Sequence, residues 1–344
     1  MPRADNWRIV THGSIDDDAM RLAIATAAAS RLVSRPNPWV GAVVVAAGGR
    51  RWVGATEAPG SRHAEIVALD AAGPAARGAT LVTTLEPCCT TGRTGPCTEA
   101  IIRAGVARVV VGVEDPDSGV QGRGVATLRA AGVAVDVGVC ATGVEQQLAP
   151  YLHHRRTGRP FVVLKMACTA DGRTAAADGS SRWITGADAR KRVHEMRAES
   201  DAVLVGAGTV RTDDPMLTVR DADGQSPRRI VLGSAPHGAR VHPCLEWTGS
   251  LPDLLDHLGG EGVLQLLVEG GRRTAASFHD AGLVDRYVLH VAPRFTGGDS
   301  APGLFSGSSA ATVADLWNGE FIGTSLLGGD LEVVLAPRQS GGQT

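Results

Sequence analysis

Apolar residues recur along the first half of the chain in short runs that are rich in valine. Such runs are typical of buried strands, and they cover residues 40–46, 79–85, 107–113 and 133–139. Alanine-rich segments lie between them, with the apolar spacing of helices, at 16–33, 63–72 and 98–104. Strands that alternate with helices predict an α/β sandwich built on one central sheet.

The same alternation starts again after residue 160. Strands are expected at 161–168, 201–208, 228–234, 263–271, 286–293 and 331–337, and helices at 187–200 and 273–282. The stretch between the halves contains Pro150, a basic cluster and Gly158-Arg159-Pro160, which is a composition typical of connections. We therefore expect α/β domains at 1–150 and 159–340 with a linker at 151–158, as the length of 344 residues also favours.

Composition narrows the classes of function. A net charge of −2 gives no reason to expect a nucleic-acid backbone or an anionic membrane as partner. No apolar run reaches the roughly 18 residues of a membrane span, and the first ten residues lack the apolar stretch of a secretory signal. Six cysteines, three of them bunched together, do not form the pattern of a disulfide framework. We expect a protein of the reducing cytoplasm.

The bunched cysteines follow a histidine and a glutamate. His63 and Glu65 stand two residues apart, and Cys88, Cys89 and Cys97 come later. Zinc takes imidazole and thiolate ligands, and a catalytic zinc keeps one coordination position for water. A carboxylate beside that water can carry a proton from it to a leaving amine, which is the expected role of Glu65. His-x-Glu with Pro-Cys is typical of zinc deaminases, although eight residues lie between the cysteines of the two Pro-Cys pairs here.

The prolines select among the three cysteines. A proline fixes the backbone at a strand-to-helix turn, and thiolates at a helix N-terminus are stabilised by the helix dipole. Pro87 and Pro96 precede Cys88 and Cys97, so these two cysteines and His63 are the predicted zinc ligands. Cys89 is expected to face away as a small apolar side chain. A purely structural zinc site is the alternative, but such a site has no use for a proton carrier such as Glu65.

The motifs HAE, LEPC and GRTGPC, with AIIRAGVARVVVGVEDPDSGVQGRG after them, resemble the deaminase half of the bifunctional riboflavin-biosynthesis deaminase–reductases. The resemblance extends from about residue 16 to residue 337. It implies a cytidine-deaminase-like α/β/α sandwich and hydrolytic deamination of 2,5-diamino-6-ribosylamino-4(3H)-pyrimidinone 5′-phosphate. The upstream PNPWVG matches the family's substrate loop, which implies that Asn37 contacts the pyrimidine.

The second half, with LKMACTADGRT and RAESDAVLVGAGTVRTDDPMLTVR, resembles the reductase domain of the same family, which has a dihydrofolate-reductase-like fold. Gly206 and Gly208 lack the third glycine of a Rossmann fingerprint, so they are weak evidence alone. Glycines 270–271 open a predicted helix, whose N–H groups can receive a pyrophosphate. The resemblance implies an NADPH site formed by Ala167, Trp183, Thr209, Asp213, Ser234, Gly271, Arg272, Arg273, Thr274, Ala275, Ala276 and Ser277.

The resemblance also implies a site for the ribosyl phosphate, whose reduction to a ribityl chain is the family's second step. The matching residues are Ser181, Arg197, Leu217, Arg220 and Glu269. Arginines suit a sugar phosphate because the guanidinium is always charged and donates in pairs. Lys165, at the end of a buried-looking strand, is a candidate for polarising the sugar carbonyl or else part of an ion pair. Asp171 is expected to fix its own turn.

Several positions depart from the family's pattern. They are Cys89-Thr90-Thr91, the shortened loop 54–62 before His63, Gly233, and Arg272-Arg273. They leave open the same chemistry on a modified substrate of a related pathway, or a paralogue in which only the reductase is active. A nucleic-acid deaminase is disfavoured because the chain lacks a basic groove signature with interleaved aromatics. Family analogy favours a homo-oligomer, either a dimer or a tetramer.

Overall fold

A computed structural model describes residues 14–91 and 95–338. The Gly92–Thr94 part of the GRTGPC motif lies outside the described residues. The chain divides after Arg156 into two compact units. In the part of the chain that is described, no helix is both long enough and apolar enough to cross a bilayer.

The first unit has a five-stranded sheet in the order β2-β1-β3-β4-β5. Its strands are β1 (Gly41–Val45), β2 (Arg51–Ala55), β3 (Thr80–Leu85), β4 (Arg108–Val113) and β5 (Ala134–Val137). Its α-helices are α1 (Ile15–Ala28), α2 (Ala64–Ala72), α3 (Cys97–Ala104), α4 (Arg123–Ala130) and α5 (Ala141–Thr157). Strand β1 is antiparallel to both neighbours, whereas β3, β4 and β5 are parallel.

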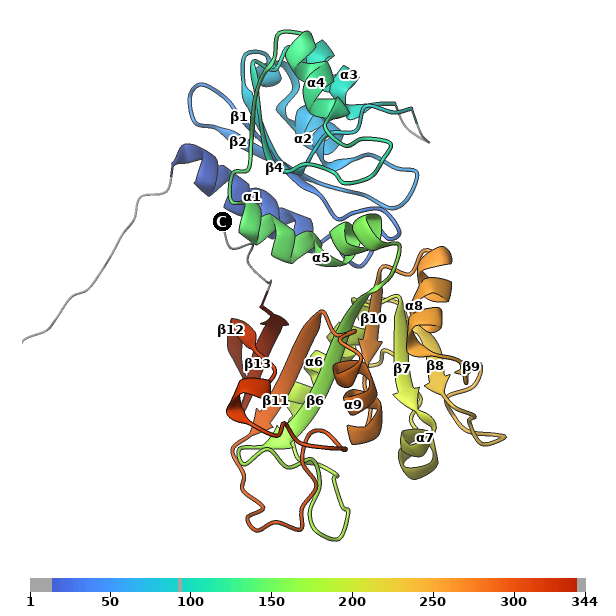
Figure 1. Cartoon of the computed structure of the whole chain (residues 1–344). Coiled ribbons are helices and arrows are strands. Elements are labelled where there is room, and N and C mark those ends of the chain that lie inside the picture. The colour runs from blue at the N-terminus through green and yellow to red at the C-terminus, as the bar shows by residue number, and fades with distance from the viewer. Residues whose placement is uncertain (1–13, 92–94, 339–344) are drawn as a thin grey trace, which may run out of the picture. The chain divides into compact units, whose positions relative to one another are not determined.

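Helices cover both faces of this sheet. Helices α1 and α5 lie on one face, and α2, α3 and α4 lie on the other (Figure 1). Glycines allow the closest approaches: a Cβ on Gly41 of β1 would stand 1.9 Å from the carbonyl oxygen of Ala23 in α1. A Cβ on Gly54 of β2 would stand 2.2 Å from the carbonyl oxygen of Ala64 in α2. The predicted three-layer sandwich is confirmed.

The stretch 151–158, expected as a linker, is helical over most of its length, because α5 continues through it to Thr157. Pro150 lies inside this helix, where it removes one N–H donor without ending the helix. Val144, Leu148 and Leu152 are buried at spacings of four residues, with Tyr151 beside them. The apolar stripe packs the helix onto the sheet, and this packing outweighs the local cost of the proline.

The second unit has an eight-stranded sheet in the order β12-β13-β11-β6-β10-β7-β8-β9. The strands are β6 (Phe161–Thr169), β7 (Ala202–Gly206), β8 (Arg228–Leu232), β9 (Leu245–Trp247), β10 (Gln265–Val268), β11 (Arg286–Ala292), β12 (Gly319–Leu327) and β13 (Asp330–Pro337). The α-helices are α6 (Ala187–Ala198), α7 (Ala207–Asp213), α8 (Leu251–Gly260) and α9 (Arg272–Asp280). The hairpin β12–β13 runs antiparallel at one edge of an otherwise parallel sheet.

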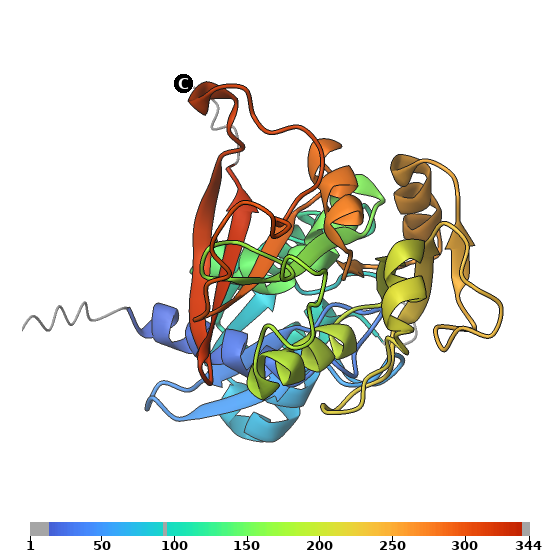
Figure 2. The same cartoon turned by 90° about the horizontal axis from the view of Figure 1, so that it is seen from below.

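The strand order of the second sheet determines on which face each crossover helix lies. The chain crosses from β6 to β7 in one direction along the sheet and returns through β10 to β11 in the other. Because both crossovers are right-handed by rule, the helices α6 and α9 fall on opposite faces. Figure 2 shows α6 (yellow-green) below the sheet and α9 (orange) above it. The carboxyl ends of the neighbouring strands β7 and β10 therefore lead into helices at the same edge of the sheet.

Candidate functional site

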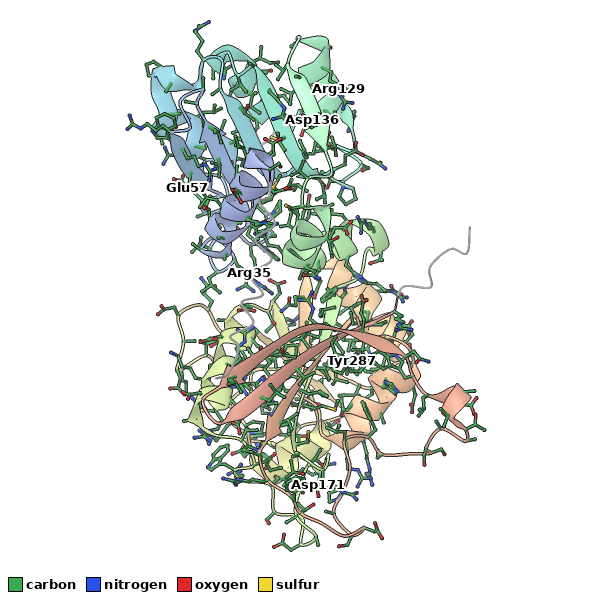
Figure 3. All side chains as sticks on the ribbon, turned by 90° about the vertical axis from the view of Figure 1, so that its left-hand side faces the viewer. Arg35, Glu57, Arg129, Asp136, Asp171 and Tyr287 are labelled. Carbon is green, nitrogen blue, oxygen red and sulfur yellow. The ribbon has the colours of Figure 1, made fainter. Side chains whose placement is uncertain are left out.

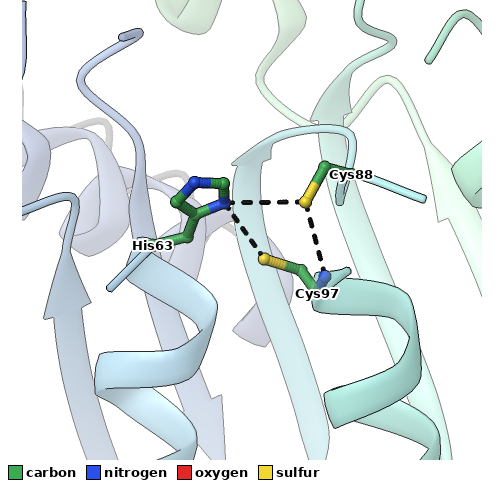
Figure 4. A group of neighbouring side chains, drawn as sticks. All are labelled: His63, Cys88 and Cys97. Carbon is green, nitrogen blue, oxygen red and sulfur yellow. Dashed lines mark hydrogen bonds between the residues drawn. The ribbon is translucent and has the colours of Figure 1, made fainter. Parts of the chain in front are cut away.

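Three side chains from separate elements of the first unit converge at one point. His63 is the N-cap residue of α2, and Cys97 is the first residue of α3. Cys88 lies in the loop that follows β3. Figure 4 shows the imidazole turned toward both sulfurs. The His63 Nδ1 atom is 3.6 Å from Cys88 Sγ and 3.3 Å from Cys97 Sγ.

The convergence suits a metal ion. The three ligand atoms all lie within 4.8 Å of one another, and one imidazole with two thiols is a donor set that zinc prefers. Cys89 takes no part, because its sulfur lies 4.0 Å from the carbonyl oxygen of Gly119 instead. The predicted grouping is therefore what the structure brings together, and the residues present fit a zinc ion.

The electrostatics of the two thiols differ. The Cys97 N–H, at the start of α3, donates to Cys88 Sγ at 3.4 Å. Hydrogen bonds from Cys97 and His63 lower the pKa of the Cys88 thiol to about 4, whereas the same pairing and burial raise the pKa of Cys97. Cys88 is not itself at a helix N-terminus, contrary to the prediction. Helix α3 nevertheless stabilises both sulfurs, one from its first residue and one through that residue's N–H.

Glu65 follows His63 by two residues, in the first turn of α2. The residue is buried, with only 4% of its surface exposed to solvent. Burial raises the pKa of this carboxyl to about 7, with the Cys88 thiolate contributing in the same direction. A carboxyl that changes protonation near neutral pH is suited to carrying protons in both directions.

Glu86 is a residue of this site that the sequence reasoning missed. It precedes Pro87 and Cys88, and it is buried. Its carboxylate accepts the backbone N–H groups of three residues, namely Asp115 at 3.2 Å, Gly122 at 2.9 Å and Val125 at 3.0 Å. It thereby anchors the Cys88 loop to the segment between β4 and α4. The signal available in the sequence was a glutamate placed directly between an apolar strand and a proline.

Asn37 lies in the turn between α1 and β1. Its backbone N–H donates to the carbonyl of Ser34 at 2.8 Å, and the Ser34 hydroxyl donates to the Asn37 carbonyl at 3.3 Å. The turn therefore holds the backbone of Asn37 and leaves its side-chain amide available.

In the second unit, two strand-to-helix turns approach each other. A Cβ on Gly206, at the end of β7, would stand 2.5 Å from Thr274 Oγ1 in α9. A Cβ on Gly271, the N-cap of α9, would stand 3.3 Å from Thr209 Oγ1 in α7. The structure thus brings together the predicted cofactor residues Thr209, Gly271 and Thr274 at adjacent helix N-termini, where backbone N–H groups can bind an anion.

The remaining predicted residues of α9 divide by exposure. Arg272, Arg273 and Ser277 are exposed, whereas Ala275 and Ala276 are buried. The Ala275 N–H already donates to Gly271 within the helix. The two alanines therefore pack against the sheet, and a phosphate can reach only the residues before them.

Arg197 and Glu269, both predicted to bind substrate, form an ion pair with two hydrogen bonds. The distances are 2.6 Å from Arg197 Nε to Glu269 Oε1 and 2.7 Å from Nη2 to Oε2. The side chains are 11% and 13% exposed, so both are largely withdrawn from water. Arg197 Nη1 also donates to the Thr218 carbonyl at 3.1 Å, which ties the pair to the segment with Leu217 and Arg220.

The sequence indicated that Lys165 ends a strand, but it lies in the middle of β6. Burial lowers the pKa of its ammonium group, and the nearby Arg197 acts in the same direction while Glu269 opposes both. The neighbouring predicted residue Ala167 is on the same strand, where it pairs with His290 of β11.

The loop 181–183, which holds the predicted site residues Ser181 and Trp183, has exposed side chains. Trp183 is 62% exposed, and the Arg190 guanidinium lies 4.7 Å from its ring centroid. Arg182 Nη2 donates to the Asp213 carbonyl at 2.9 Å, which brings this loop to the end of α7. Ser181, Arg220 and Ser234 are exposed, and Leu217 is buried.

Asp171 fixes its turn, as predicted. The carboxylate accepts the Thr169 hydroxyl and the N–H groups of Thr296 and Gly297, the last at 2.9 Å. These hydrogen bonds tie the turn after β6 to the loop after β11, at the end of the unit where Figure 3 labels Asp171. The hydrogen bond with Thr169, followed by those from Gly297 and Thr296, holds the pKa of this carboxyl far below its usual range.

Comparison with known families separates the same two parts of the chain. Residues 14–113 match the cytidine and deoxycytidylate deaminase zinc-binding region, and residues 160–317 match the RibD C-terminal domain. The riboflavin biosynthesis protein RibD of Mycobacterium tuberculosis is 42% identical over 342 residues, covering 94% of this chain and 97% of that protein. The RibD protein of Escherichia coli is 37% identical over 343 residues, covering 87% of this chain and 93% of its own length.

Solved structures agree with this assignment over nearly the whole length. RibD of Acinetobacter baumannii has a TM-score of 0.86 and 34% identity, covering 94% of this chain and 99% of that one. A Thermotoga maritima protein described as a diaminohydroxyphosphoribosylaminopyrimidine deaminase/5-amino-6-(5-phosphoribosylamino)uracil reductase has a TM-score of 0.85 and 32% identity, with the same coverage. The zinc-type ligand set, the two matched domains and these relatives show that the chain belongs to the RibD family of riboflavin biosynthesis, bifunctional enzymes with a zinc-dependent deaminase half and an NADPH-dependent reductase half.

Proposed function

We propose that the first unit deaminates 2,5-diamino-6-ribosylamino-4(3H)-pyrimidinone 5′-phosphate and that the second reduces the ribosyl group of the product to a ribityl chain. The observation that carries this proposal is the convergence of His63, Cys88 and Cys97 near the buried Glu65. The description of the Thermotoga maritima relative, which names a deaminase and a reductase of such compounds, supports the choice of substrate.

In the deaminase half, His63, Cys88 and Cys97 would hold the zinc ion, which supplies the Lewis acidity that lowers the pKa of the attacking water. Glu65 takes the proton from that water and delivers it to the leaving amine. One water is consumed, the bond from C2 to the amino nitrogen breaks, ammonia leaves, and a carbonyl remains at C2. Asn37 contacts the pyrimidine from the turn before β1.

In the reductase half, a bound NADPH would supply the hydride that reduces C1 of the ribosyl group. The N–H groups of Arg272, Arg273 and Thr274 at the start of α9 would hold its pyrophosphate, and the two guanidinium groups would add positive charge there. The remaining contacts with the cofactor come from Ala167, Trp183, Thr209, Asp213, Ser234, Gly271, Ala275, Ala276 and Ser277. The packed alanines contribute shape, since their side chains face the sheet.

The ribosyl phosphate is held by Ser181, Leu217 and Arg220, with Glu269 beside them. Because Arg197 already donates two hydrogen bonds to Glu269, its role is to position that carboxylate. The exposed Arg220 is left as the guanidinium for the phosphate. Lys165 polarises the sugar carbonyl, for which its lowered pKa provides a proton donor of suitable strength.

We also propose that the boundary between the two functional domains lies along the chain near Arg156 and Thr157, which is supported by the start of the match to the RibD C-terminal domain at residue 160. We further propose a cytoplasmic homo-oligomer, a dimer or a tetramer. All six cysteines are unpaired thiols, which supports a reducing compartment. Light scattering on the purified chain and fractionation of the source cells test these two points.

The deciding experiment supplies the diaminopyrimidine ribosyl phosphate together with NADPH and identifies both products. Ammonia and the ribityl compound are expected from the intact chain. Glu65→Gln should keep its zinc, lose deamination by about 10²- to 10⁴-fold, and still oxidise NADPH when given the deaminated intermediate. Glu99→Gln, on the exposed side of α3, is the matched control and should behave as the parent.

Normal ammonia release by Glu65→Gln would contradict the proton-carrying role. Absence of turnover on this substrate, with zinc bound and NADPH oxidised on the intermediate, would contradict the deaminase substrate instead. It would favour a modified substrate, for which Cys89, Thr90 and Thr91 beside the site are the first residues to replace.

A further inference from the structure

The second unit contains another convergence of metal-binding side chains, away from the catalytic residues discussed so far. His242, Cys244 and Glu246 lie in and after the loop that joins β8 to β9, and their ligand atoms are all within 4.8 Å of one another. Within residues 14–91 and 95–338, such a grouping of three occurs here and at His63, Cys88 and Cys97. Neither proposed reaction uses the residues of this second group.

The spacing explains how one short segment places three ligands together. Alternate residues along a strand point to the same side, so Cys244 and Glu246, on either side of Leu245 in β9, share one side. His242 precedes a bend at Pro243, and its ring reaches Cys244 directly, with Nδ1 3.5 Å from Cys244 Sγ. Strand β9 is the edge strand of its sheet, and His242 and Glu246 are exposed while Cys244 is half-buried. An ion can therefore reach the three side chains from solvent.

The imidazole is oriented as in known metal sites. His242 Nε2 lies 3.2 Å from the carbonyl oxygen of Pro236, and this oxygen can only accept a hydrogen bond. The proton is therefore on Nε2, and the lone pair of Nδ1 faces Cys244 Sγ at 3.5 Å. Metal-binding histidines commonly donate their other N–H to a carbonyl, which fixes the tautomer and the orientation of the ring.

The carboxylate is also held in place. Glu246 Oε1 accepts the N–H of Ala235 at 3.2 Å, which leaves the other oxygen for an ion. Two of the three side chains are thus held by the backbone at the beginning of the same loop, at Ala235 and Pro236. These residues directly follow Ser234, one of the proposed contacts with NADPH.

We propose that His242 Nδ1, Cys244 Sγ and the Glu246 carboxylate form a second zinc site that clips the β8–β9 loop closed. A set of nitrogen, sulfur and oxygen donors favours zinc over magnesium or calcium, which take oxygen ligands. Binding displaces the proton of the Cys244 thiol. The ion fixes the end of the loop directly, and it fixes the beginning, beside Ser234, through the hydrogen bonds of His242 and Glu246 with Pro236 and Ala235.

Metal analysis tests the proposal directly. The full chain is loaded with zinc, freed of loosely held ion by gel filtration, and expected to retain about two zinc ions. His242→Ala and Cys244→Ser should each retain about one. The matched controls His237→Ala, an exposed histidine in the same loop, and Cys140→Ser, a thiol of the first unit, should retain the parent content.

A parent chain with a single zinc, or a Cys244→Ser chain with the parent content, would overturn the second site. Cys88→Ser separates this site from the deaminase centre: it should retain one ion, which the double variant with Cys244→Ser loses. Cobalt in the Cys88→Ser chain should show a thiolate charge-transfer band that disappears when Cys244 is also replaced.

A second readout needs no change at the deaminase centre. Arg240 is exposed in the loop between Pro236 and His242, where trypsin can cut. Zinc should slow cleavage after Arg240 in the parent chain and leave the rate in Cys244→Ser unchanged. Equal slowing in both chains, or in neither, would contradict a zinc clip formed by these residues.

Discussion

Two adjacent thiols of the first unit point in different directions. Cys88 Sγ faces His63 and Cys97, whereas Cys89 Sγ lies near the Gly119 carbonyl. Cys88→Ser should lose the deaminase zinc and ammonia release, because a hydroxyl is a poor substitute for a thiolate ligand. Cys89→Ser should keep both. Metal content and ammonia release measured on each variant check this, and loss of the deaminase zinc from Cys89→Ser would mean that the ligands were misassigned.

The sequence predicted the grouping of His63, Cys88 and Cys97 because residue chemistry and adjacent prolines are local signals. It did not predict what holds the group in place. Glu86 accepts N–H groups from residues 29 to 39 positions further along the chain. Arg197 and Glu269 are separated by 72 positions, so their pairing also became visible only in the fold.

At the scale of elements, helix α4 passes close to the loop that carries Cys88. A Cβ on Gly124 would stand 2.1 Å from the Pro87 carbonyl oxygen and 3.1 Å from Glu86 Oε1. Gly124→Ala must therefore push the loop away from the helix, at a cost of about 1–3 kcal/mol. We expect a lower free energy of unfolding and weaker zinc binding, measured by denaturation and by competition with a chelator.

Gly95→Ala is the control for this substitution. A Cβ on Gly95 would meet no atom within 4 Å, although the residue belongs to the same Cys88–Cys97 segment. Its stability and zinc affinity should match those of the parent chain. An equal loss in both variants would mean that the effect is not the approach of α4.

Helix α5 shows why an element can be hidden from sequence reasoning. Pro150 and the basic residues that follow it have the composition of a connection, and the expectation of a linker rested on them. In the fold, an apolar stripe of Val144, Leu148 and Leu152 is buried against the sheet and fixes the helix. Tertiary packing of this kind overrides local propensity, and the sequence of a single segment does not reveal such packing.

Strands β11 and β13 share a buried polar pair across their register. His290 is 0% exposed, and its Nε2 atom lies 3.1 Å from Glu332 Oε2. Burial lowers the pKa of this imidazole below its ordinary value of 6.5. The unfolded chain therefore binds more protons than the folded chain just below pH 6.5. The free energy of unfolding should fall as the pH falls from that value toward the folded-state pKa.

His290→Gln removes this titration while an amide N–H can still donate to Glu332. Denaturation by urea at a series of pH values should give a shallower fall in stability below pH 6.5 for this variant than for the parent. The lowered pKa of Glu332 contributes only below its own ordinary value of 4.5. His237→Gln, in an exposed loop, should leave the slope unchanged, and an unchanged slope in His290→Gln would contradict the argument.

At the scale of the whole molecule, the alternation of strands and helices predicted two α/β units because it restarts after residue 160. It did not predict the order of strands in the second sheet. Strand β10 inserts between β6 and β7, and the hairpin β12–β13 extends the sheet beyond β11. The position of β10 and that of the hairpin both depend on which strand the returning chain pairs with. Packing between segments far apart along the chain decides that pairing.

The two activities should respond differently when metal is removed from the whole chain. All three ligands of the deaminase centre belong to the first unit, and none of the residues proposed to hold NADPH belongs to either cluster of metal-binding side chains. A chelator should therefore abolish ammonia release and leave NADPH oxidation on the deaminated intermediate largely intact. Adding zinc back should restore deamination. Parallel assays of both steps on one chelated sample check this, and joint loss of both activities would mean that the reductase also depends on bound metal.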